Sequence, residues 1–150
     1  MKYKSLLILA AFGILVASCE RNGKCGVKNI SSSGGHESHN NGRNCMSCHT
    51  DGGEGKGCFT AAGSAYTSNG GVSQNVVMRL YTQPNGQGEL KATVNGDALG
   101  NFYTTDNINY SGGLYPTITF ASGTVKHMPS SITSGACNSC HGSSSGRIEE

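Results

Sequence analysis

The sequence contains no tryptophan, only three prolines, and charged residues make up just 13% of it. No run of basic residues is present, which excludes the electrostatic footprint of a nucleic-acid-binding protein. No segment shows a helical period, apart from single turns that we expect at two short motifs near the chain ends. Glycine is abundant, with 23 residues in 150. This composition indicates many short strands joined by turns.

The one long apolar run lies at the N-terminus. Residues 1–18 combine two lysines with an apolar stretch from Leu6 to Val16, the pattern of a secretory signal peptide that is too short for a spanning helix. The stretch ends in VASC, which resembles the lipobox of bacterial lipoproteins, where Cys19 would be lipidated. The alternative is ordinary cleavage nearby, with Cys19 left as a free or disulfide-bonded thiol. We expect an exported, membrane-anchored lipoprotein that faces the periplasm or lies at the outer membrane or cell surface.

The remaining 132 residues carry nine basic and nine acidic side chains and suit one domain. Residues 19–44 are rich in Ser, Gly and Asn and predict a flexible tether. Residues 45–150 are expected to form the folded domain. Short segments rich in β-branched and aromatic residues follow there, at 58–67, 76–82, 90–94, 101–105, 115–122 and 124–128. They predict a small antiparallel β-sandwich over about 58–128.

Two copies of one motif bracket this sandwich, CMSCH at 45–49 and CNSCH at 137–141. In Cys-x-x-Cys-His, the two thiols add across the vinyl groups of a haem, and the adjacent histidine is the proximal iron ligand. The motifs predict two c-type haems, at or near the ends of the sandwich. Haem attachment is assigned to Cys45, Cys48, Cys137 and Cys140, and proximal ligation to His49 and His141.

Two other readings of the cysteine pairs carry less support. Thiol–disulfide exchange by a thioredoxin-type motif expects a βαβ context, which this sequence lacks. A four-cysteine zinc site could join both pairs, but the pairs lie about 90 residues apart and the repeated trailing histidine would go unexplained.

Distal ligands for the two irons must come from the remaining histidines and methionines. His39 lies six residues before Cys45, a span of about 20 Å when extended, and is favoured over His36 for the first haem. For the second haem the choice lies between Met128 and His127, which point to opposite faces of an extended segment. Met128 is favoured, since Pro129 biases it toward extended geometry.

Two cysteines remain, Cys25 and Cys58, an even number in an oxidising compartment. We expect a disulfide between them, which would tie the N-terminal segment to the first strand.

The phrase DALGNFY (97–103) has the Asp-x-x-Gly-x-Phe form of carboxypeptidase-regulatory-like, transthyretin-type sandwiches, in which Gly makes a tight turn and the aromatic enters the core. With SHNNGRNCMSCH, GLYP, KHMPSS and GACNSCHG, it makes the chain resemble small exported dihaem c-type cytochromes in which such a sandwich separates two Cys-x-x-Cys-His sites. The resemblance implies electron transfer in the periplasm or at the outer surface of a metal- or mineral-respiring type of bacterium. It implies a methionine as second distal ligand.

The expected function is therefore electron transfer by a lipid-anchored dihaem cytochrome, more an electron carrier than an enzyme. The expected partners are redox proteins such as other multihaem cytochromes, together with the membrane; self-assembly is left open. One alternative is a dihaem peroxidase-like oxidoreductase, which needs an open or displaceable iron position and a polar catalytic group above it. Another is a β-sandwich binding module with accessory haems.

Overall fold

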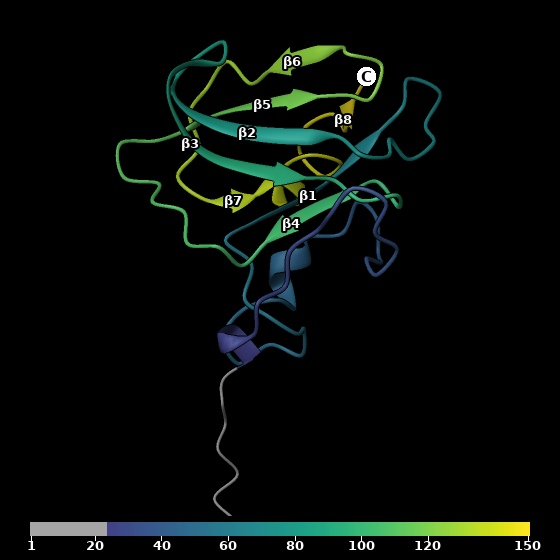
Figure 1. Ribbon diagram of the computed structural model, residues 1–150, viewed down its shortest axis with the longest axis vertical. Helices are drawn as coiled ribbons and strands as arrows, with labels where there is room; N and C mark the ends of the chain where they lie inside the picture. Colours follow the sequence, from purple (N-terminus) through teal and green to yellow (C-terminus); the bar gives the residue numbers. More distant parts are fainter. Residues whose placement is uncertain (1–23) are drawn as a thin grey trace, which may run out of the picture.

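The computed structural model describes residues 24–150 (Figure 1), so the expected signal peptide and Cys19 lie outside the described residues. The described chain is mainly β, with two sheets and no α-helix. Three 3₁₀ turns are present: η1 (Lys24–Gly26), η2 (Cys45–Ser47) and η3 (Cys137–Ser139). The strands are β1 (Ala61–Tyr66), β2 (Val77–Gln83), β3 (Gln87–Asn95), β4 (Asn101–Thr104), β5 (Tyr115–Thr119), β6 (Val125–His127), β7 (Gly135–Ala136) and β8 (Ile148–Glu149).

One sheet is antiparallel throughout, in the order β3-β2-β5-β6. In β2, Met78 and Leu80 are buried, whereas Val77 and Arg79 are partly exposed. This is the period-2 alternation that places successive side chains on opposite faces. The six predicted strand segments overlap β1 to β6, so the sequence-based prediction of these strands is confirmed.

The other sheet is mixed, and for this sheet the prediction of antiparallel pairing is wrong. Strand β4 pairs with β1 antiparallel, but β7 and β8 both pair with β1 in parallel. Strands β7 and β8 have two residues each, too few to produce a recognisable alternation in the sequence. They return to β1 through long connections, which parallel pairing requires.

The two sheets lie face to face, with the antiparallel sheet above β1, β4 and β7 in Figure 1. Between them lies a core cluster that includes Ala65 of β1, Phe102 of β4 and Leu80 of β2. The other face of the mixed sheet is also covered, because every residue of β1 is buried. There Ala62 packs with Phe59, Tyr103 and residues of the first Cys-x-x-Cys-His motif. Strand β1 therefore lies between the core and the first motif, whereas Cys137 of the second motif packs against the core cluster itself.

The turn before β4 bears out the roles expected for the DALGNFY segment. The Asp97 carboxylate accepts hydrogen bonds from the N–H groups of Leu99 and Asn101, both at 3.0 Å. Gly100 has a φ of 80°, a conformation that glycine adopts without a steric penalty. Phe102, 1% exposed, enters the core.

The described part of the expected tether is not free but lies along the sandwich. Ser31 is 3% exposed, its N–H donates to the Tyr103 carbonyl at 2.9 Å, and its hydroxyl accepts from the Tyr103 N–H at 2.7 Å. The Gly35 carbonyl accepts from the Ala98 N–H at 2.9 Å. The segment lacks apolar periodicity because polar, mostly backbone contacts hold it in place, and these leave no pattern in the sequence.

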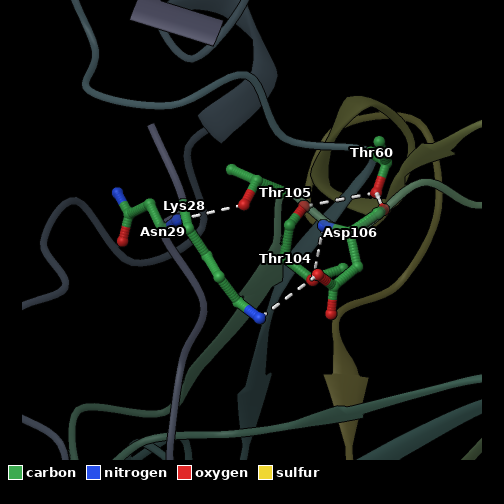
Figure 2. Close-up of polar contacts among 6 residues, drawn as sticks. All are labelled: Lys28, Asn29, Thr60, Thr104, Thr105 and Asp106. Atoms are coloured by element: carbon green, nitrogen blue, oxygen red, sulfur yellow. Dashed lines mark hydrogen bonds and ion pairs between the residues drawn. The ribbon is translucent and has the colours of Figure 1, made fainter. Parts of the chain in front are cut away.

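Figure 2 shows further contacts of this segment with the end of β4. The Asn29 N–H donates to the Thr105 hydroxyl at 3.0 Å, and the Lys28 ammonium lies 3.8 Å from the Asp106 carboxylate. The Thr60 hydroxyl, just before β1, lies 2.5 Å from the Asp106 carbonyl. The contacts at Thr105 and Asp106 thus connect the N-terminal segment to the chain just before β1 and just after β4.

Cys25 and Cys58 form a disulfide, with Cα atoms 4.4 Å apart, which is the pairing expected from the cysteine count. The two residues are 33 positions apart, and the first Cys-x-x-Cys-His motif lies between them. A crosslink over a loop of this length restricts the unfolded chain. It also fastens the segment that carries His36 and His39 to the start of the mixed sheet.

Candidate functional site: the two Cys-x-x-Cys-His motifs

Both Cys-x-x-Cys-His motifs fold into the same 3₁₀ turn. In each, the carbonyl of the first cysteine accepts hydrogen bonds from the N–H groups of the second cysteine and of the histidine. The distances are 3.2 and 3.0 Å to Cys45, and 3.2 and 2.9 Å to Cys137. The serine in each motif likewise bonds back to the residue before the turn, at 2.7 Å for Ser47 and 2.6 Å for Ser139. Repetition of the sequence therefore produces repetition of the local structure.

The histidine of each motif is held through the same ring nitrogen. His49 Nδ1 lies 3.0 Å from the Lys56 carbonyl, and His141 Nδ1 lies 2.7 Å from the Gly146 carbonyl. A carbonyl oxygen only accepts, so Nδ1 carries the proton in each bond. In the neutral imidazole the lone pair is then on Nε2, which is the tautomer that a metal-ligating histidine needs.

A cavity of about 800 Å³ opens beside the first motif, within the size range of cofactor sites. Its lining includes Cys45, Cys48, His49 and His39. The rings of His39 and His49 have centroids 6.0 Å apart, with planes inclined at 35°. His36, the alternative distal ligand, does not line this cavity.

The distance between these two rings is close to that of two imidazoles that would share one metal ion. Metal–imidazole bonds are about 2 Å long, and the ring centroid lies roughly 1 Å beyond the nitrogen, so the two centroids would be about 6 Å apart. The observed 6.0 Å between His39 and His49 fits this value. Two thiols and two imidazoles thus line one cavity, and these are the side-chain types that would hold a c-type haem.

Packing fixes the His49 ring more tightly than its hydrogen bond alone. The ring is 8% exposed and stacks on Phe59, with centroids 4.0 Å apart and planes inclined at 7°. In addition, a Cβ atom at Gly55 would lie 2.6 Å from the imidazole. Glycine is therefore required at position 55 for the loop to close over the histidine.

The first thiol of each motif is shielded, whereas Cys48 and Cys140 are exposed. Burial raises the pKa of the Cys45 thiol. Burial, with smaller contributions from Cys45 and Cys140, raises the pKa of the Cys137 thiol to about 12. Both groups are therefore neutral S–H groups near pH 7. Addition of S–H across a carbon–carbon double bond needs no oxidant, which suits thioether formation.

The second motif has a smaller, polar pocket of about 200 Å³ beside His141. Arg43 and Arg147 both line it, and the Arg147 guanidinium lies 4.7 Å from the centre of the Tyr66 ring. Neither His127 nor Met128 lines this pocket. The structure thus brings the expected distal histidine to the first motif but neither expected distal residue to the second.

His127 and Met128 lie at the edge of the antiparallel sheet, at the end of β6. His127 is paired with Thr117 in β5, and its Nδ1 lies 3.0 Å from the Thr117 hydroxyl. The neighbouring Ile118 points into the core, so the His127 ring lies on the face of the sheet that is turned away from the core. By alternation, Met128 points to the inner side.

The two motifs are neighbours in space. Strand β1 contacts both η2 and η3, and the Asn138 side chain in the second motif donates to the Arg43 carbonyl, just before the first, at 2.9 Å. The sequence left open whether the motifs lie at the same end or at opposite ends of the sandwich. The structure places them together on the mixed sheet.

The four motif cysteines are unpaired thiols. Within residues 24–150, no three side chains of His, Cys, Asp or Glu converge to hold a metal ion. No helix in the described range has the length and hydropathy to cross a membrane.

Several residues of the site were not identified from the sequence. The carbonyls that orient the histidines belong to Lys56 and Gly146, and a backbone acceptor carries no residue-type signal. A glycine-rich loop follows the first motif, at 52–57, and this feature could have indicated the tight closure over His49. Arg43 and Asn138 were missed because their contacts join distant parts of the chain.

Comparisons of the chain with protein-family models, with curated proteins and with solved structures give no match.

Proposed function

We propose that this protein is an exported dihaem c-type cytochrome that passes single electrons between redox partners. The observation that carries the proposal is the pair of imidazoles, His39 and His49, with ring centroids 6.0 Å apart beside the two thiols of a Cys-x-x-Cys-His motif. A haem held there would supply an iron that alternates between two oxidation states, so no substrate pocket is needed. The second motif has the same turn and the same histidine tautomer, which supports a second haem.

In this proposal the chain contributes attachment, orientation and dielectric environment at the first haem. Cys45 and Cys48 would form the thioethers, and His49 and His39 would be the proximal and distal ligands. The Lys56 carbonyl holds the Nδ1 proton of His49, which raises the basicity of Nε2 as a ligand. Phe59 shields the ring from water. Axial ligands, the hydrogen bonds to them and burial are the features by which a protein sets the reduction potential of a haem.

For the second haem, the proposed ligands are Cys137, Cys140 and His141, with Met128 as distal ligand in preference to His127. The pairing of β6 with β5 supports Met128, because His127 lies on the outer face beside Thr117 and Met128 on the inner side. Met128 must approach His141 when the haem is bound, since it does not line the pocket there. Thioether ligation raises the potential relative to bis-histidine ligation, which would make the first haem the lower-potential site.

The Met128→Ala variant should lose the sulfur-to-iron charge-transfer band and leave about half of the haem high-spin or water-bound, because one of two irons is affected. His127→Ala is the matched control and should keep the band. Near-infrared and visible spectra of both variants measure this. Loss of the band in His127→Ala alone, or no band in the unmodified protein, would exclude Met128 as the ligand.

We further infer that the sandwich is of the carboxypeptidase-regulatory-like, transthyretin type, supported by the Asp97–Gly100–Phe102 turn.

We also propose, from the sequence, that lipidated Cys19 attaches the protein to a membrane. The proposed redox partners are other multihaem cytochromes. Membrane fractionation of a Cys19→Ala variant tests the anchor, since the variant should become soluble. The Cys25–Cys58 disulfide suits an oxidising compartment.

One observation favours a peroxidase-like oxidoreductase as a second candidate. The pocket beside His141 contains Arg43, Arg147 and Tyr66 but no histidine or methionine besides His141 itself. An iron there with an exchangeable position under polar groups is what peroxide chemistry needs.

A redox titration of the holoprotein, followed by turnover with hydrogen peroxide, separates the two functions. Electron transfer predicts two one-electron transitions at different potentials and no peroxide turnover above that of free haem. Peroxide-dependent oxidation of a dye that is lost in Arg147→Gln would support the enzyme instead.

A further inference from the structure

The residue after the first cysteine differs between the two motifs, and this difference has structural consequences. In the first motif it is Met46, which packs on the apolar cluster of Phe59, Ala62 and Tyr103. In the second it is Asn138, which is 5% exposed. Both residues attach their motif to the mixed sheet, one through apolar contact and the other through hydrogen bonds.

Asn138 uses all of its polar atoms within the protein. Its amide N–H groups donate to the Arg43 carbonyl and to the Ser64 hydroxyl, both at 2.9 Å. Its side-chain oxygen accepts from the Ser64 N–H at 3.1 Å. The second motif is therefore bonded directly to β1 and to the backbone that precedes Cys45.

From Ser64 the network continues toward the segment that carries His39. The Ser64 hydroxyl donates to the Asn101 side-chain oxygen at 2.5 Å and accepts from the Gly42 N–H at 2.9 Å. The Asn101 amide donates to the Ser38 hydroxyl at 2.9 Å and to the His39 carbonyl at 3.4 Å. Ser64 and Asn101 are each 1% exposed.

The donor directions along this chain are consistent. Asn138 donates to Ser64, Ser64 donates to Asn101, and Asn101 donates to the residues at and before His39. A buried network in which every member is satisfied is rigid and specifies one arrangement, whereas loss of one member leaves its partners unpaired away from water.

We propose that Asn138, a residue of the second motif, is a positioning residue for the first haem: through Ser64 and Asn101 it holds the segment 38–43 so that His39 faces His49. The inference rests on the proposed function, since it concerns the distal ligand of a haem. It adds that the two haem sites form one structural unit, so that a substitution in the second motif changes the distal ligation of the first haem.

The test compares Asn138→Asp with two reference variants in the full-length holoprotein. Asp keeps the size and an acceptor oxygen but removes both amide donors. His39→Ala defines the spectral component that is lost when the first haem loses its distal ligand. Ser139→Ala is the matched control within the second motif, because its hydroxyl bonds only to Ala136 and to the adjacent Cys140 thiol.

Asn138→Asp should retain two covalent haems by intact mass and lose the same low-spin component that His39→Ala loses, in the electron paramagnetic resonance spectrum. Ser139→Ala should leave that component unchanged. In the haem-free protein, the Gly42 amide should exchange its hydrogen faster in Asn138→Asp, since its acceptor Ser64 is no longer held. Two retained haems with an unchanged first-haem component, or a change confined to the second haem, would overturn the inference.

If Asn138→Asp does not fold, the Ser64→Ala variant removes the central hydroxyl instead. The inference predicts that this variant also loses the low-spin component of the first haem, and an unchanged component would overturn it. A chain that folds but carries no covalent haem would instead refute the proposed function, so the two failures are distinguishable by mass alone.

Discussion

Replacement of Cys45 and Cys48 by alanine should leave one covalent haem per chain, and replacement of Cys137 and Cys140 should remove the other. The physical reason is that each turn presents its own pair of thiols. Cys45 and Cys48 line the larger cavity, whereas Cys137 and Cys140 do not line the pocket beside His141. A thioether survives denaturation, so intact mass under denaturing conditions counts the attached haems. We expect the loss of about half of the pyridine-haemochrome absorbance in each double variant.

The matched control removes the other two described cysteines. Cys25 and Cys58 are bonded to each other, so their double serine variant should keep both haems, although it should be less stable by about 2–5 kcal/mol. If either motif variant retained two haems, or if both lost all haem while still folded, the assignment of one haem to each motif would fail.

The second large effect is expected at His39. His39→Ala should convert the first haem from low-spin to high-spin or water-bound, which changes about half of the total low-spin signal, because one of two irons loses an imidazole. The structure gives the reason, since the His39 ring centroid lies 6.0 Å from that of His49. Electron paramagnetic resonance and visible spectra measure the change, and added imidazole should restore the low-spin state.

His36→Ala is the matched control, three residues away and outside the cavity. It should leave the spectrum and both potentials unchanged. The opposite result, with His36→Ala high-spin and His39→Ala unaffected, would mean that the segment before Cys45 shifts its register when haem binds.

The structure brings the two proposed ligands of the first site together but not those of the second. His39 lies ten residues before His49, and the short span of chain limits where its ring can go. Met128 lies thirteen residues before His141, but β6 belongs to the antiparallel sheet while η3 rests on β1 of the mixed sheet. Sequence distance alone could not reveal that the intervening chain passes from one sheet to the other.

The fold was predictable where local patterns are strong. The alternation of Met78 and Leu80 with Val77 and Arg79 is visible in the sequence, and the six main strands follow from such signals. Strands β7 and β8 were not predictable from the sequence, because two-residue strands depend on a partner far along the chain. The polar network of Asn138, Ser64 and Asn101 was hidden for the same reason, since it exists only once the motifs pack on β1.

The central claim is that each Cys-x-x-Cys-His motif carries a covalently bound haem. The most direct measurement is the intact mass, under denaturing conditions, of the full chain produced with a haem-attachment system, together with its pyridine-haemochrome spectrum. The account predicts a mass increase of two haem groups per chain and the spectrum of thioether-linked haem. A folded chain without haem, in which Cys45–Cys48 and Cys137–Cys140 are disulfides or bind zinc, would contradict it.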